Sequence, residues 1–304
     1  MARHHHHPDP AAGDLRVALA VAVNLALTVA QIVGGLFAGS LSLIADALHN
    51  LSDAMSLIIA FVARRIGRRP SDESMTFGYA RVEIVAALIN YTTLIIIGLF
   101  LVYEASMRFF EPQIVDGWLI VIIACIALAV DAITGLLTYT LSRQSINMRA
   151  AFLHNVADAL GSVGVIVAGT LIIIYDWWII DPIVTLGIAG YILWLSITEI
   201  GGVIRILMLG SPPDIDMNQL IDSITEVVGV NGVHHAHLWQ MDEHRNAMDA
   251  HIVIDGGSWH RADDIKQHVR DVLLRDHSIA HVTLELECRR HACTDTQLIG
   301  YTSH

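Results

Sequence analysis

Charged residues are scarce in this chain of 304 residues, at 16% of the sequence against 54% hydrophobic residues. This hydrophobic fraction exceeds what the single compact core of a soluble protein can bury, and soluble proteins carry a larger fraction of charged residues. The formal net charge of −12 excludes a nucleic-acid-binding protein with a broad basic face, since phosphate neutralisation needs clustered Lys and Arg. Three cysteines are too few for a disulfide framework and fit folding at a reducing cytoplasmic face. The N-terminus shows no cleavable signal pattern. The composition therefore predicts a protein of the lipid bilayer.

Six apolar stretches are each long enough to cross a bilayer, which takes roughly 20 residues. They cover residues 17–38, 41–63, 84–105, 118–141, 150–174 and 180–204. Arginines gather after the second stretch, between the fourth and fifth, and after the sixth. By the positive-inside rule these faces and both termini are cytoplasmic. We expect a multi-pass protein of the cell's inner (plasma) membrane with an all-α, six-helix transmembrane domain.

The chain becomes polar and acidic beyond residues 210–213. Its hydrophobic pattern predicts a helix, two strands, a helix and a third strand at residues 214–228, 232–240, 246–254, 259–276 and 280–287. Two helices on a three-stranded sheet make a small α+β cytoplasmic domain of order αββαβ. We therefore expect four regions: a His-containing cytoplasmic segment (1–14), a transport domain (15–208), a cytoplasmic domain (209–287) and a Cys- and His-containing tail (288–304).

The pattern His-Asn-x-x-Asp-Ala occurs twice, at residues 49–54 in the second stretch and 154–159 in the fifth. Residues four apart lie on one helix face, so His49 and Asp53 point the same way, as do His154 and Asp158. If the two helices pack together, two imidazoles and two carboxylates form a four-coordinate set of the kind that zinc favours. The set contains no thiolate, and it is not the all-oxygen set that suits magnesium or calcium.

The alternative is a structural role for these side chains, since a lone buried histidine is more often a core residue than a ligand. An Asp at the centre of a bilayer, however, costs about 2.5–3.5 kcal/mol on insertion scales and must face a partner or water. Two matched pairs, with the only two histidines of the predicted spans, favour a metal site. Neighbouring polar residues can orient the ligands or join helices instead; they are Asp46, Asn50, Asn155 and Asp131. Asp181 is expected to begin the sixth helix rather than to bind anything.

A metal site in the membrane without a hydrolytic partner predicts transport. Protonation of histidine, whose usual pKa is about 6.5, weakens the ligands and releases the ion, so metal can move outward as protons move inward by alternating access. Two alternatives stay open. A membrane metalloenzyme lacks support because His-Glu-x-x-His is missing, and a membrane metal sensor would not need ligands inside two spans. We expect no enzymatic activity.

The chain resembles the cation diffusion facilitator family over roughly residues 15–287. The resemblance lies in the six-span layout, the paired His-x-x-x-Asp motifs, the Ser-Leu-Ser-Leu-Ile-Ala-Asp-Ala segment at 40–47, Phe77-Gly78, and Val-His-His-Ala-His-Leu-Trp at 233–239. It implies a homodimeric zinc–proton antiporter of the zinc-selective bacterial branch that exports metal from the cytoplasm, with cadmium or cobalt as secondary substrates. It also implies a ferredoxin-like cytoplasmic domain that binds metal and stabilises the dimer.

The resemblance singles out His234, His251 and Glu287 as a cytoplasmic zinc site. The alternative is that these residues simply belong to a soluble surface. Weaker candidates are Glu285, His237 and His260.

The tail offers a second cytoplasmic possibility. Cys288, His291 and Cys293 supply two thiolates and an imidazole, which suits zinc if a fourth ligand comes from elsewhere. The histidine run at residues 4–7 can supply it as a flexible, zinc-collecting segment, unless that run is a cloning remnant.

Overall fold

The computed structural model describes residues 10–142, 146–290, 292–293 and 297–300. For part of the helical residues, Asp53 and His154 among them, it describes the backbone alone. The chain divides into two compact units. We call residues 1–62 and 89–200 the helical unit, and residues 63–88 and 201–304 the C-terminal unit.

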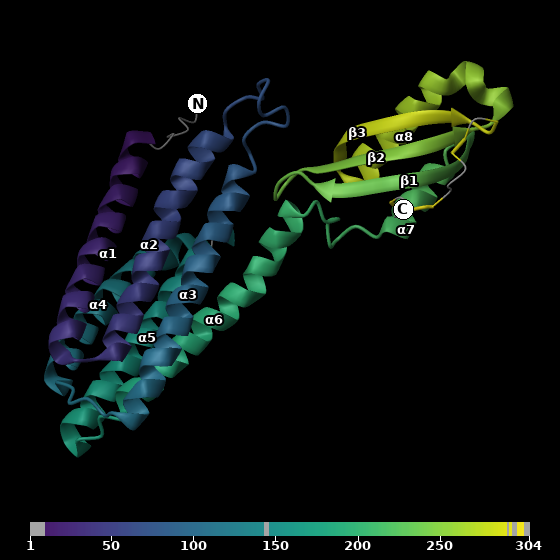
Figure 1. The fold of residues 1–304 in the computed structure, drawn as a ribbon. Coiled ribbons are helices and arrows are strands. Elements are labelled where there is room, and N and C mark those ends of the chain that lie inside the picture. The colour runs from purple at the N-terminus through teal and green to yellow at the C-terminus, as the bar shows by residue number, and fades with distance from the viewer. Residues whose placement is uncertain (1–9, 143–145, 291, 294–296, 301–304) are drawn as a thin grey trace, which may run out of the picture. The chain divides into compact units, whose positions relative to one another are not determined.

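Six long helices contain the six predicted apolar stretches (Figure 1). They are α1 (Pro10–Ala38), α2 (Leu41–Gly67), α3 (Val82–Phe110), α4 (Gly117–Ser142), α5 (Ile146–Tyr175) and α6 (Ile180–Leu207). Within the described residues, four segments are long and apolar enough to cross a membrane: Val82–Phe110, Gly117–Thr134, Val156–Tyr175 and Ile180–Leu207. A shorter apolar helix covers Ala22–Ala38. The predicted helical membrane domain is confirmed, and the chain is a multi-pass membrane protein.

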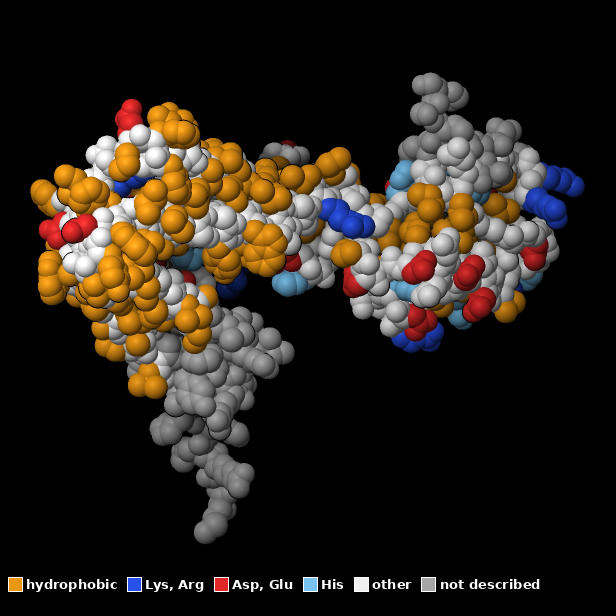
Figure 2. All heavy atoms as spheres, turned by 90° about the horizontal axis from the view of Figure 1, so that it is seen from below, with side chains coloured by type: hydrophobic (Ala, Val, Ile, Leu, Met, Phe, Trp, Pro, Cys, Tyr) orange, Lys and Arg blue, Asp and Glu red, His pale blue; other side chains and the backbone are white. Residues whose placement is uncertain are grey.

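Hydrophobic side chains cover the visible face of the helical unit, as Figure 2 shows. Phe37 and Trp194, for example, are 82% and 66% exposed. Polar side chains lie inside instead, and Gln31, Ser42 and Ser162 are at most 1% exposed. This inversion of a soluble protein's pattern fits a bilayer, because lipid accepts apolar surface whereas polar groups must find partners within the protein.

The first turn of α2 is capped by a carboxylate from another helix. Asp181, at the start of α6, is fully buried and accepts hydrogen bonds from the backbone N of Leu41 at 2.8 Å and of Ser42 at 3.2 Å. It also accepts from the hydroxyls of Ser40 and Ser42, each at 2.6 Å. Arg108 near the end of α3 reaches it at 3.3 Å. Asp181 therefore begins α6 as expected, and its carboxylate also caps α2, a contact that the sequence does not predict.

The C-terminal unit contains the predicted αββαβ fold. Its elements are α7 (Met217–Thr225), β1 (Val230–Gln240), β2 (Asn246–Ile254), the 3-10 helix η1 (Gly256–Arg261), α8 (Ala262–His277) and β3 (Ile279–Cys288). The sheet order is β1-β2-β3, with β1 and β2 antiparallel and β2 and β3 parallel.

One face of this sheet packs against both helices. Side chains from α7 (Leu220, Ile224), β2 (Ile252) and α8 (Val269, Leu273) share one hydrophobic core. Because side chains alternate along a strand, the residues between the core positions of β2 point to the opposite face. His251 lies on that second face, which is where the candidate ligands gather.

Candidate metal sites

The first site is built on the packing of α2 against α5. The Nε2 atom of His49 lies 3.4 Å from Oδ1 of Asp158, and these side chains are 15% and 10% exposed. One turn away, a Cβ added at Gly161 would lie 3.6 Å from Oδ1 of Asp46. The structure therefore brings together one residue from each predicted motif, on two helices in contact.

The other two predicted ligands, Asp53 and His154, belong to α2 and α5, but their side chains lie outside those described. The same is true of Asn155.

Polar side chains continue from this contact into the interior. Gln31 of α1 donates from Nε2 to Oδ2 of Asp46 at 2.6 Å and accepts from Nδ2 of Asn50 at 3.1 Å. On α4, Asp131 accepts from the hydroxyl of Ser162 on α5 at 3.2 Å. These contacts join α1, α2, α4 and α5 through buried groups, which suits the expected role in holding helices together.

The second site lies on the sheet face that the helices leave uncovered. His234 of β1 stands opposite His251 of β2, which in turn stands opposite Glu285 of β3. Glu287 lies two residues further along β3 and so on the same face as Glu285. The strand register thus gathers the three residues singled out by the family resemblance, although they are far apart in sequence.

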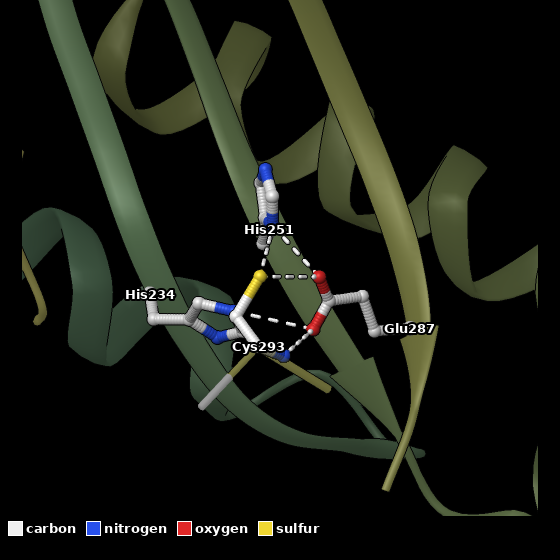
Figure 3. A group of neighbouring side chains, drawn as sticks. All are labelled: His234, His251, Glu287 and Cys293. Carbon is white, nitrogen blue, oxygen red and sulfur yellow. Dashed lines mark hydrogen bonds and ion pairs between the residues drawn. The ribbon is translucent and has the colours of Figure 1, made fainter. Parts of the chain in front are cut away.

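Cys293 completes this group (Figure 3). His234, His251, Glu287 and Cys293, here called the sheet cluster, offer four donor atoms that all lie within 4.8 Å of one another. Nδ1 of His251 is 2.8 Å from Oε1 of Glu287, and Nε2 of His234 is 3.2 Å from Oε2. The sulfur of Cys293 lies 3.3 Å from Oε1 of Glu287 and 3.7 Å from Nδ1 of His251. Two imidazoles, a carboxylate and a thiol are all ligands that zinc accepts.

The contacts around Glu287 and His251 favour their use as metal ligands. Burial acts to raise the pKa of the Glu287 carboxyl, but hydrogen bonds from His251 and Cys293 outweigh it and hold that pKa below its usual value. The second ring nitrogen of His251, Nε2, lies 3.3 Å from Oε2 of Glu285. Metal-bound histidines commonly use their other nitrogen in this way, because the carboxylate fixes the ring orientation and raises its basicity.

The remaining candidates are placed less favourably. Cys288 ends β3, His237 lies in β1 opposite Asp249, and His260 is exposed in η1. His291 and the histidine run at residues 4–7 lie outside the described residues. Among the described residues, the structure thus places Cys293 with His234 and His251 rather than in a cluster of the tail alone.

Two profiles of one protein family match the chain. Residues 17–208 match the cation efflux transmembrane domain, and residues 212–288 match the cytoplasmic domain of cation efflux proteins. The chain belongs to the cation efflux family. This confirms the resemblance drawn from the sequence, and it places the protein among transporters and not among enzymes.

Several relatives in the cation efflux family are similar over most of their length. The zinc transporter ZitB of Pectobacterium atrosepticum is 34% identical over 97% of this chain and 91% of its own. A cadmium, cobalt and zinc/H(+)-K(+) antiporter of Bacillus subtilis is 34% identical over 86% of this chain and 85% of its own. The metal cation efflux system protein CzcD of Cupriavidus metallidurans is 30% identical over 93% and 89%.

Proposed function

We propose that this cation efflux protein exports zinc from the cytoplasm in exchange for protons. The transport site consists of His49, Asp53, His154 and Asp158 between α2 and α5. The observation that carries the proposal is the 3.4 Å approach of His49 Nε2 to Asp158 Oδ1.

The order of contacts along the two helices supports extending this site to the full motif. Residue 46 lies against 161 and residue 49 against 158, so the numbers rise along α2 as they fall along α5. The two helices therefore run antiparallel. One further turn brings position 53 level with position 154, which is the second pair of the motif.

The ligand set accounts for zinc as the substrate. Two imidazoles and two carboxylates suit the borderline softness and tetrahedral preference of zinc. The named activities of the relatives, a zinc transporter and an antiporter of cadmium, cobalt and zinc, agree with this set. Cadmium and cobalt are then secondary substrates.

Proton exchange follows from the charges of the site. Two carboxylates make it doubly negative, so the site is neutral either with one Zn²⁺ or with both imidazoles protonated. A poorly hydrated interior favours these neutral states over a bare carboxylate pair. A protonated His49 can pair with Asp158 at the observed distance, so protons entering from outside replace the ion as it leaves.

The remaining features follow from the same proposal. The protein works in the inner membrane with both termini in the cytoplasm, because the arginine-rich loops stay on that side. It acts as a homodimer, and the cytoplasmic residues His234, His251 and Glu287 bind zinc as a regulatory ligand.

A flux measurement in proteoliposomes tests the antiport. The purified protein is reconstituted with a zinc-sensitive dye inside, and zinc is added outside under an imposed pH gradient of either sign. We expect zinc entry to accelerate when the lumen is acidic and to slow when the gradient is reversed. Zinc flux that does not respond to the pH gradient would refute proton exchange, and an absence of zinc flux under every gradient would refute the transport function.

A further inference from the structure

The C-terminal tail lies along the edge of the sheet. The backbone N of His235 donates to the carbonyl of Gln297 at 2.9 Å, and that of Ala236 donates to the carbonyl of Leu298 at 3.0 Å. Ala236 and Ile299 form a parallel bridge. Since β1 is an edge strand, residues 297–300 add a short fourth strand segment to the sheet, the mode by which extended peptides bind to exposed edges.

An irregularity in β1 positions residues for both the sheet cluster and this tail contact. The pairing of β1 with β2 shifts between His234 and His237, and His235 has the left-handed φ of 49°. Such a bulge redirects neighbouring side chains and interrupts regular pairing. Here His234 contributes to the cluster, while the next two residues donate their backbone N–H groups to the tail. Nδ1 of His235 adds a contact of 2.8 Å to the carbonyl of Gly300.

Cys293 connects the tail to the cluster. It lies between the end of β3 at Cys288 and the docked segment 297–300, and its own backbone N donates to Oε2 of Glu287 at 3.2 Å. The contacts between donor atoms described above run from 2.8 to 3.7 Å, and all four donor atoms lie within 4.8 Å of one another. The ligands of a tetrahedral zinc ion lie roughly 3.3–3.8 Å apart, given bond lengths of about 2.0–2.3 Å. The cluster therefore needs only small shifts to close on an ion.

We propose that the thiolate of Cys293 is the fourth ligand of the cytoplasmic zinc site, together with His234, His251 and Glu287, and that zinc binding fastens the tail onto β1. This inference rests on the regulatory zinc site proposed above. It adds a thiolate ligand to that site and couples zinc binding to docking of the C-terminal tail. A carboxylate and a thiolate balance the charge of Zn²⁺, which removes the cost of gathering these groups in a place where His234 and Glu287 are 3% and 7% exposed.

The thiolate sets this site apart from the transport site. Sulfur ligands select zinc, cadmium or cobalt over magnesium and manganese. Because the tail supplies this ligand, metal binding stabilises the docked tail, and the protected edge of β1 then reports the cytoplasmic metal level. The alternative is that the Cys293 thiol only donates a hydrogen bond to Glu287 and that the tail docks without metal.

Cobalt spectroscopy on the purified full-length protein decides between them. Thiolate-bound Co²⁺ gives a charge-transfer absorption in the near ultraviolet, and only three cysteines in the chain can produce it. Cys125 lies in α4 and Cys288 ends β3, so C125S and C288S are matched controls for C293S. We expect the absorption in the wild type and both controls, its loss in C293S, and an increase of at least ~10-fold in the dissociation constant for zinc at the remaining cluster, measured by competition with a zinc chelator.

A wild type without thiolate absorption, or a C293S variant that keeps it, would overturn the ligand assignment whatever the transport assay shows. Tail docking is measured separately by hydrogen exchange at the amides of His235 and Ala236. Zinc should slow their exchange in the wild type and in C288S but not in C293S. If all three proteins exchange equally with and without zinc, metal does not fasten the tail.

Discussion

The two candidate metal sites share imidazole and carboxylate ligands but differ in sulfur and in how the fold assembles them. The site between α2 and α5 draws on two short motifs whose spacing the helix repeat itself aligns, and it contains no sulfur. The sheet cluster draws on β1, β2, β3 and the tail, residues that only the strand register brings together, and it includes Cys293. The difference fits the two proposed tasks. A transported ion must be released in every cycle, which protonatable His and Asp allow, whereas a sensed ion can stay bound to a thiolate.

The largest expected effect is the loss of zinc flux when a ligand of the membrane site is replaced, compared with replacement of a buried polar residue that is not a ligand. Asp158→Asn removes the carboxylate next to His49, and we expect zinc flux in proteoliposomes to fall by about 100-fold or more, because a ligand and a proton partner are both lost. Asp131→Asn is the matched control, since it changes another buried membrane carboxylate but keeps a partner for Ser162. Equal losses in the two variants would remove the distinction between a ligand and a structural Asp.

A second comparison concerns stability rather than flux. Asp181→Asn leaves Arg108 facing a neutral amide and weakens the cap of α2, and breaking such a buried pair costs about 3–5 kcal/mol. The thermal midpoint of the detergent-purified protein should fall well below that of the wild type. Asp176→Asn, an exposed change between α5 and α6, is the control. If the two variants have the same thermal midpoint, Asp181 does not hold the ends of α2, α3 and α6 together.

A smaller effect is expected where a residue supports a ligand without being one. Glu285→Gln weakens the contact to Nε2 of His251, and the dissociation constant for zinc at the sheet cluster should rise by about 10-fold while flux at saturating zinc stays unchanged. Competition with a fluorescent zinc chelator measures the affinity, and Glu243→Gln in the exposed β1–β2 turn is the control. A loss of maximal flux in Glu285→Gln would contradict the separation of the two sites.

The smallest expected effect is the loss of stability when the exposed cap of α7 is removed, which we compare with the buried cap of α2. Asp216 caps α7 from an exposed position, accepting from the backbone N of Asn218 at 2.8 Å. Asp216→Ala should cost only about 1 kcal/mol, since water can replace an exposed cap. Asp214→Ala, at an exposed neighbour that caps nothing in the described structure, serves as reference in the same melting experiment. A decrease in thermal midpoint as large as that of Asp181→Asn would show that burial does not determine how much these caps contribute to stability.

The sequence predicts local features well and nonlocal ones poorly. Apolar runs and strand alternation are local, so the six long helices and the αββαβ order agree with the structure. The contact of His49 with Asp158 follows from two motifs, each of which fits on one helix face. The return of Cys293 to the sheet and the capping of α2 by Asp181 depend on chain segments that meet only after folding. A buried Asp at a membrane helix end was the available signal for the second of these.

We propose that one chain carries two independent zinc sites of different chemistry. Equilibrium dialysis of the purified protein against zinc tests it most directly, using the wild type, Asp158→Ala, His251→Ala and the double variant. We expect two zinc ions per wild-type chain, one in each single variant and none in the double variant. Two ions retained in Asp158→Ala, or both lost through one substitution, would contradict it.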